Sequence, residues 1–245
     1  MSVILTHRIH VLSRKEELGT VELAGKVVIV LDILFATTTM TVALAHGATM
    51  VIPTLDEASA RVESALHPGG SFVLAGELYA NVFEGFTAPT PLALLDHGVR
   101  DKKLILATTN GTVAVKESAA ADHLYVASLL NGAAMVSHVL SNHPTNPIVI
   151  VCSGSMGNFN FEDYYGAGYL VDLFAKSLGH DVDLSDAARA SRAVFSSGKP
   201  VEMLSNCRVG RIMTGRGHAR EIDYAARLSS LQVVPRLENG VIVAI

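Results

Sequence analysis

Two eight-residue stretches of this chain are nearly identical, and each lies where a strand would pass into a helix. Residues 36–43 read Ala-Thr-Thr-Thr-Met-Thr-Val-Ala, and residues 107–114 read Ala-Thr-Thr-Asn-Gly-Thr-Val-Ala. Each follows an apolar run, Val27–Leu31 or Leu104–Leu106, and each precedes a stretch that can be helical. This repetition predicts two similar βα units whose turns face one pocket. Hydroxyl and N–H groups at a helix N-terminus favour an anion, so phosphate is the first ligand to expect.

Strand and helix patterns alternate along the chain, which predicts an α/β fold. Continuous β-branched runs such as Val27–Leu31 are typical of strands buried on both faces. We expect a three-layer α/β/α architecture with a mainly parallel sheet, built from repeated βα units, and with binding loops at the carboxyl ends of the strands. No linker divides residues 1–245, so we expect a single α/β domain or two intimate halves.

The individual elements follow from the same patterns, with Gly76–Pro91 expected to be a long loop. The expected strands are Val3–Leu12, Val27–Leu31, Met50–Pro53, Ser71–Ala75, Lys103–Ala107, His123–Ala127, Ile148–Cys152, Leu231–Val234 and Val241–Ile245. The expected helices are Thr38–His46, Leu55–Leu66, Thr112–Ala119, Asn131–Leu140, Phe161–Ser177, Asp183–Ser196 and Val201–Cys207.

The composition excludes several classes of protein. Apolar residues make up 49% and charged residues 17% of the chain, which argues against disorder. A net charge of −4 without a basic run argues against a nucleic-acid partner. Two cysteines are too few for a disulfide scaffold, and neither a signal core nor a membrane-length apolar stretch is present. We expect a cytoplasmic protein with a small-molecule ligand and no membrane partner, and a homo-oligomer remains open.

Polar residues follow four of the expected strands at the points where these strands end. A carboxylate inside an apolar run, as at Asp32, is costly unless it is paired or bound to a metal. The other three groups are Glu77, the segment Thr108-Thr109-Asn110-Gly111-Thr112, and Ser153-Gly154 followed by Glu162-Asp163 at the head of the longest expected helix.

Carboxylates beside Gly, Thr and Ser loops suit Mg²⁺ bridged to a phosphate. We expect Asp32, Glu77, Glu162 and Asp163 to be the catalytic carboxylates, with the metal held by Asp32, Glu77 and Asp163 or, in place of Asp163, Glu162. The loops are expected to hold the phosphoryl oxygens through Thr37, Thr38, Thr39, Thr108, Thr109, Asn110, Gly111, Ser153 and Gly154. The attacking group, water or Asp32 itself, stays open.

The motifs as a set resemble the 2-phosphosulfolactate phosphatase family over nearly the whole chain. They are Val-Leu-Asp32-Ile-Leu-Phe-Ala-Thr-Thr-Thr, Gly76-Glu77, Glu84-Gly85-Phe86, Thr108–Thr112, and Cys152-Ser153-Gly154 through Phe161-Glu162-Asp163. Asn131, Arg211, Asp223 and Val234-Pro235 also fit the family pattern. The resemblance implies a Mg²⁺-dependent phosphatase with a three-layer α/β fold, acting on phosphosulfolactate on the way to coenzyme M. It also adds Asn131 and Arg211 to the expected substrate-binding residues.

The chain departs from the family pattern at positions that matter for anions. Phe35 and Leu78 stand where the family has arginines, and Thr87–Pro91 replaces a polar loop. Arginine binds carboxylate, sulfonate and phosphate in a bidentate manner that Phe and Leu cannot reproduce. These losses favour a less anionic analogue of the family substrate. Arg208, Arg211, Arg216 and Arg220 crowd one C-terminal segment, where they either compensate or form a solvated face.

Two other functions remain as alternatives. A catalytically retired paralogue that binds a small anion would explain the missing arginines. A serine hydrolase would use Ser155 in Ser-Gly-Ser-Met-Gly, with Asp181 or Asp183 and His218 in the required chain order. A haloacid-dehalogenase-type phosphatase is excluded because Leu34 occupies the position of its second aspartate.

Overall fold

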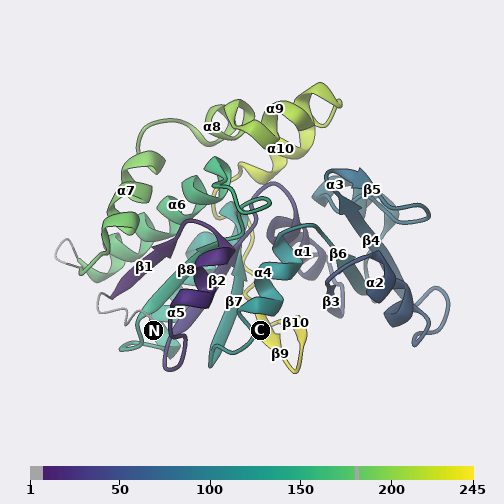
Figure 1. Ribbon diagram of the computed structural model, residues 1–245, viewed down its shortest axis with the longest axis horizontal. Helices are drawn as coiled ribbons and strands as arrows, with labels where there is room; N and C mark the ends of the chain where they lie inside the picture. Colours follow the sequence, from purple (N-terminus) through teal and green to yellow (C-terminus); the bar gives the residue numbers. More distant parts are fainter. Residues whose placement is uncertain (1–7, 180–181) are drawn as a thin grey trace.

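A computed structural model describes residues 8–179 and 182–245 of the chain. Within these residues the strands form one ten-stranded, mostly parallel sheet between helical layers (Figure 1). The predicted three-layer α/β fold is therefore confirmed. In the same residues, no helix has the length and apolar character that a membrane span requires.

The strand order in the sheet is β1-β8-β2-β7-β9-β10-β3-β6-β4-β5. The strands are β1 (Ile9–Leu12), β2 (Val27–Leu31), β3 (Met50–Thr54), β4 (Phe72–Leu78), β5 (Asn81–Val82), β6 (Lys103–Ala107), β7 (His123–Ala127), β8 (Ile148–Cys152), β9 (Pro235–Glu238) and β10 (Val241–Ala244). The α-helices are α1 (Ala36–Ala45), α2 (Glu57–Ser64), α3 (Pro91–His97), α4 (Gly111–Glu117), α5 (Gly132–Asn142), α6 (Phe161–Leu178), α7 (Asp186–Phe195), α8 (Pro200–Asn206), α9 (Arg208–Gly215) and α10 (Ala219–Ala225). Two short 3₁₀ helices are η1 (Lys15–Thr20) and η2 (Leu129–Asn131).

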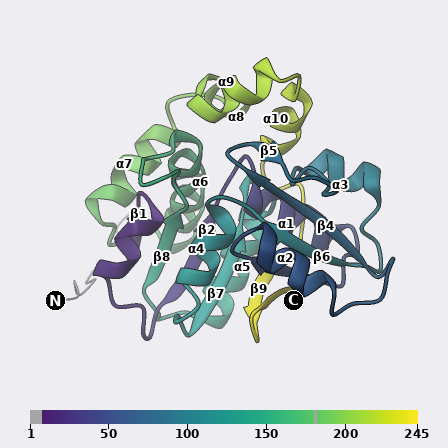
Figure 2. The same cartoon turned by 45° about the vertical axis from the view of Figure 1, so that its right-hand side comes forward.

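The sheet consists of two parallel blocks joined by a hairpin from the C-terminal part of the chain. One block is β1-β8-β2-β7 and the other is β3-β6-β4, each with parallel pairing throughout. The hairpin β9–β10 lies between them and pairs antiparallel with β7 on one side and β3 on the other. Figures 1 and 2 show the hairpin at the lower edge of the molecule, between the two blocks.

Alternate residues of the strands pack into different helical layers, as a period of two requires. Val27, Ile29 and Leu31 of β2 share a cluster with α5 and α6, whereas Val28 and Val30 share a cluster with α1 and α4. The second cluster also includes residues of β3, β4 and β6. Helices α1 and α4 therefore pack against both blocks and bring the turns that precede them together.

Some predicted boundaries differ from the structure. The part of Val3–Leu12 before residue 8 lies outside the described residues, and the expected strand Leu231–Val234 is wrong, because pairing begins at Pro235. The predicted loop Gly76–Pro91 is also partly wrong, because β4 continues to Leu78 and turns back into β5. Helices α3, α9 and α10 were not expected.

Candidate active site

A cleft of about 260 Å³ lies where the carboxyl ends of four strands meet. Its wall includes Asp32 after β2, Glu77 in β4, Asn110 after β6 and Gly154 after β8. Helix α9 covers the opposite side of the cleft, in the group of helices above the strand ends in Figure 2. The structure thus brings both parallel blocks and a C-terminal helix to one site.

Asp32 lies between the N-termini of two helices at the bottom of this cleft. Its carboxylate accepts a hydrogen bond from the N–H of Ala36, the first residue of α1. On the other side, a Cβ atom added to Gly111, the first residue of α4, would lie 2.4 Å from Asp32 Oδ2. Burial, with repulsion from Glu77 and Glu162, raises the pKa of Asp32 from 3.8 to about 7.

Glu77 is held in the cleft by donors from two loops. The N–H of Thr109 donates to Oε1 at 2.8 Å, and the N–H of Ala80 donates to Oε2 at 2.6 Å. The Thr109 hydroxyl donates to the same carboxylate and accepts from the N–H of Tyr79. This set of bonds fixes the carboxylate of Glu77 and joins the end of β4 to the turn after β6.

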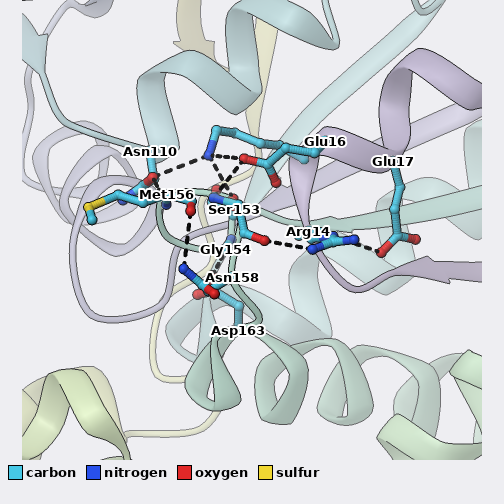
Figure 3. A network of polar contacts seen from close by, with 11 residues as sticks. Arg14, Glu16, Glu17, Asn110, Ser153, Gly154, Met156, Asn158 and Asp163 are labelled. Carbon is cyan, nitrogen blue, oxygen red and sulfur yellow. Dashed lines mark hydrogen bonds and ion pairs between the residues drawn. The ribbon is translucent and has the colours of Figure 1, made fainter.

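Neighbouring carboxylates at the head of α6 have different surroundings. Glu162 lines the cleft, and burial raises the pKa of its carboxyl. Asp163 is fully buried and accepts hydrogen bonds from the N–H of Ile33 at 2.9 Å and of Gly154 at 3.1 Å. Each Asp163 oxygen thus holds one turn, one after β2 and one after β8. Figure 3 shows Asp163 beside Gly154 of the second turn. Glu162, rather than Asp163, is the α6 carboxylate that faces the cleft.

The Gly/Ser turn after β8 does not offer free N–H groups to an anion. The N–H of Gly154 donates to Asp163, that of Met156 to Asn110, and that of Gly157 to Glu16. The N–H of Ser155 donates to a backbone carbonyl within the turn. Each of these groups is bonded within the protein, so this turn leaves no backbone donor for an anion.

Apart from Thr109, the threonines of the repeated motif bond within the protein instead of facing the cleft. Thr37 Oγ1 accepts from the N–H of Asp32 and donates to its carbonyl, and Thr112 Oγ1 makes the same pair of bonds with Thr108. In the structure, Thr112 therefore plays the role in its turn that Thr37 plays in the other turn. The sequence repeat, by contrast, aligns Thr37 with Thr108. Thr38 and Thr39 are fully buried and donate to the carbonyls of Ile33 and Pro89.

Three more of the expected substrate-binding residues lie away from the cleft. Asn131 is buried and bonds to Ser128 and to the carbonyl of Val233. Ser153 is fully buried, and its Oγ has no partner among the described residues. Arg211 donates to the carbonyl of Asn206 and lines a separate hollow. Of the expected set, Asp32, Glu77, Thr109, Asn110, Gly154 and Glu162 line the cleft.

Two arginines, one at each end of α9, and one buried lysine complete the charges around the site. Arg208 and Arg216 line the cleft, and they donate hydrogen bonds to Asn160 Oδ1 and to the carbonyl of Ala80. Lys15 is 7% exposed and bonds to Asn110. Arg208 and Arg216 stood out as part of a basic segment, but Lys15 lies in the polar stretch Ser13–Glu17, which carries no local signal of burial.

The carboxylates fit a magnesium ion that is shared with substrate and water. Among the described residues, no three His, Cys, Asp or Glu side chains are grouped so that they could hold a metal by themselves. Mg²⁺ is usually bound by one or two carboxylates together with water and substrate phosphate. Asp32 and Glu162 both line the cleft, and repulsion from Glu162 helps to raise the pKa of Asp32, which is the kind of repulsion that a cation relieves.

An acidic cleft with two arginines, at the carboxyl ends of parallel strands, defines an α/β enzyme suited to an anionic substrate. Residues 12–240 match the model of the 2-phosphosulpholactate phosphatase family. The chain belongs to this family, and its class is that of the phosphoric monoester hydrolases.

Curated relatives resemble the chain over nearly its full length. A probable 2-phosphosulfolactate phosphatase of Carboxydothermus hydrogenoformans is 34% identical over 95% of each chain. One of Symbiobacterium thermophilum is 33% identical over 91% of this chain and 95% of its own length. One of Clostridium tetani is 27% identical over 96% of this chain and 99% of its own. The predicted family resemblance is thereby confirmed.

Proposed function

We propose that this protein is a Mg²⁺-dependent phosphatase that hydrolyses a small phosphate monoester. The observation that carries the proposal is the cleft itself, in which Asp32, Glu77 and Glu162 face Arg208 and Arg216. Carboxylates without arginines would repel a phosphate, and arginines without carboxylates would bind it with no group to hold a metal or orient water. The combination supports hydrolysis as well as binding.

Asp32 and Glu162 are the residues that would hold the metal, because Glu77 is already bonded to three donors and Asp163 is outside the cleft. Bound there, Mg²⁺ supplies Lewis-acid stabilisation of the charge on the phosphoryl oxygens. Arg208 and Arg216 bind the remaining phosphoryl oxygens from the α9 side. A carboxylate that the metal does not fully engage orients the attacking water.

The wall of the cleft favours 2-phosphosulfolactate or, more strongly, a less anionic analogue of it. Phe35, Met156 and Ile212 line the cleft, so much of the surface beside the charged groups is apolar. Leu78, the second position where the family has arginine, faces a neighbouring hollow instead of the cleft. Phe35 is therefore the departure that bears on specificity. With 2-phosphosulfolactate as substrate, the expected setting is the cytoplasmic route to coenzyme M.

Phosphate release from a panel of phosphate monoesters, with Mg²⁺ or with EDTA, tests the activity. The panel contains 2-phosphosulfolactate and phospholactate, which lacks the sulfonate. We expect Mg²⁺-dependent release and a higher kcat/KM for phospholactate. Release that is unchanged by EDTA would contradict the metal requirement, and no release from any ester would favour the retired paralogue.

The variant Phe35→Arg tests the specificity, and Leu78→Arg is its matched control. A charged hydrogen bond contributes about 1.5–3 kcal/mol, so Phe35→Arg should shift the ratio of the two kcat/KM values toward 2-phosphosulfolactate by roughly tenfold or more. Leu78→Arg should leave the ratio unchanged, because Leu78 is outside the cleft. An equal shift in both variants would show that the apolar wall does not select the substrate.

The serine hydrolase alternative has less support from the site. Ser155 lines the cleft, but the described residues that form its wall include no histidine. His218 lies in an adjoining hollow, and Asp181 is outside the described residues. Since a serine nucleophile needs a base within hydrogen-bond reach, we favour metal-assisted hydrolysis.

A further inference from the structure

Lys15 connects the two turns that form one side of the cleft, although it does not line the cleft itself. Its Nζ lies 3.2 Å from Asn110 Oδ1, 3.4 Å from the carbonyl oxygen of Ser153 and 2.9 Å from Glu16 Oε1. An ammonium group has three N–H donors, and these three acceptors use all of them. Lys15 therefore has no donor left for a substrate.

The bonds to Asn110 settle which way its side-chain amide points. Asn110 Oδ1 lies 3.2 Å from Lys15 Nζ and 3.2 Å from the N–H of Met156, and both of these groups are donors. Two donors on the same atom require that atom to be the carbonyl oxygen. Figure 3 shows Asn110 beside Met156, with Glu16 and Ser153 close to both.

The NH₂ group of Asn110 is consequently the part left for a ligand. Asn110 lines the cleft, and its Nδ2 has no hydrogen-bond partner within residues 8–179 and 182–245. The backbone N–H groups of Gly154–Gly157 are already bonded to acceptors of the protein, so a side-chain donor at this place has no competitor from that turn.

We propose that Lys15 is a positioning residue, which locks the Asn110 amide so that its NH₂ donates to a phosphoryl oxygen of the substrate. The inference rests on the proposed function, since it takes the ligand of the cleft to be a phosphoryl group. Without the lysine, the Asn110 amide can rotate and present its carbonyl oxygen, which repels the phosphoryl oxygens. Lys15 thus acts on the substrate through the orientation of the Asn110 side chain.

Binding of inorganic phosphate, measured by titration calorimetry, tests the inference without requiring turnover. Lys15→Met should weaken phosphate binding by about tenfold or more, the effect of losing a hydrogen bond to a charged group. Lys26→Met is the matched control, because Lys26 is equally buried at 8% exposed but bonds to the carbonyl of Ala24. Equal phosphate affinity in the two variants would overturn the proposal.

A double-mutant cycle separates positioning from simple structural support. Asn110→Ala removes the whole amide without adding a charge, so it should weaken phosphate binding at least as much as Lys15→Met. In the Asn110→Ala background, Lys15→Met should then cause little further loss. Additive losses would show that Lys15 does not act through Asn110. Lys15→Arg, which keeps donors at this place, should recover part of the affinity.

Kinetics with the panel of esters distinguish this proposal from the proposed function. A native protein that binds phosphate but releases none from any ester would contradict the proposed phosphatase activity. The double-mutant cycle of phosphate binding would then still decide whether Lys15 positions Asn110. Native protein without measurable phosphate binding would overturn the positioning role. The amide proton signals of Asn110, assigned by their absence in Asn110→Ala, should shift on phosphate addition in the native protein, and an unshifted pair would also overturn it.

Discussion

At the scale of single residues, neighbouring carboxylates in this site have different roles. Both oxygens of Asp163 accept hydrogen bonds from backbone N–H groups, and these bonds hold the turns after β2 and β8. Asp32 accepts from one helix N-terminus and faces the cleft with Glu77 and Glu162 near it. A buried carboxylate with like charges around it destabilises the folded protein unless a cation or a proton offsets them. The charge of Asp32 is therefore costly in the folded protein.

Replacing Asp32 by Asn should raise stability at neutral pH while it removes the metal ligand. The folded pKa of about 7 lies above the ordinary 3.8, so the folded state is favoured fully below pH 3.8 and loses that advantage as the pH rises through 7. At about 1.4 kcal/mol per pH unit, the loss reaches roughly 4 kcal/mol. In EDTA at pH 8, Asp32→Asn should have a free energy of unfolding roughly 1–4 kcal/mol above that of the native protein.

Urea unfolding between pH 4 and pH 8, with and without Mg²⁺, measures this effect. The gain should vanish near pH 4, and Mg²⁺ should stabilise the native protein but not the variant. Asp172→Asn is the control, because Asp172 is buried but paired with Arg192 and Lys176, so the same change should lower stability. A difference in the free energy of unfolding between Asp32→Asn and the native protein that is no larger at pH 8 than at pH 4 would contradict the charge argument.

Residue types were easier to predict than the direction in which their side chains point. Asp32 stood out because it interrupts an apolar run, and it does line the cleft. The threonines were also predicted to bind the ligand, yet the Thr37 hydroxyl accepts the N–H of Asp32 in its own turn. A hydroxyl this close to an unpaired backbone N–H bonds to it in preference to a ligand. Lys15 could not be found from its neighbours, since the partners that bury it lie far along the chain.

At the scale of elements, α1 and α4 converge so closely that one of them has to begin with glycine. A Cβ at Gly111 would lie 2.3 Å from Ala36 Cβ and 2.4 Å from Asp32 Oδ2, well inside contact distance. The first residues of the two helices and the carboxylate of Asp32 therefore share one small space. The approach of these helices is what sets the position of Asp32.

Gly111→Ala should both destabilise the protein and lower its activity. Overpacking at such a contact costs about 1–3 kcal/mol, and the alanine can be accommodated only by moving α4 or Asp32. Gly215→Ala is the matched control in α9, because a Cβ there meets nothing within 4 Å. It should change the free energy of unfolding by about 0.5 kcal/mol or less. Equal unfolding midpoints in urea for the two variants would refute the close approach.

Strands were predicted to the residue where burial on both faces leaves a continuous apolar run. This holds for β2, β6, β7 and β8, whose observed bounds match the predicted ones. Helices α3 and α9 were missed, because they are short and are stabilised by packing against other helices more than by local propensity. The hairpin β9–β10 had an available signal in Asn239-Gly240, both with positive φ, as a two-residue hairpin turn requires.

At the scale of the whole molecule, the two parallel blocks depend on the hairpin for their connection within the sheet. Ile242 of β10 is fully buried, pairs with Val51 of β3 and belongs to the cluster that α1 and α4 share with both blocks. The cleft takes residues from both blocks, so its geometry depends on this junction. A defect in the hairpin should therefore affect the site, although the hairpin does not line it.

Ile242→Ala should lower the free energy of unfolding by about 2–5 kcal/mol, as is usual for a buried large-to-small change. Ile245→Ala, at an exposed position three residues further on, should change it by about 0.5 kcal/mol or less. Urea unfolding followed by circular dichroism and by cleft activity should give one shared midpoint, shifted in Ile242→Ala alone. Separate midpoints, with one block unaffected, would show that the hairpin does not couple the blocks.

The place of this hairpin in the chain has a consequence for biosynthesis. A ribosome delivers β7 and β3 long before β9 and β10, so the nascent chain holds two unfinished sheets, each with an unpaired strand facing the gap. Open strand edges are the surfaces through which unfinished proteins aggregate. This risk of aggregation ends only when residues 235–244 leave the ribosome and pair with β3 and β7. We therefore expect the chain to need chaperones during translation, and variants altered in residues 235–244 to accumulate in inclusion bodies.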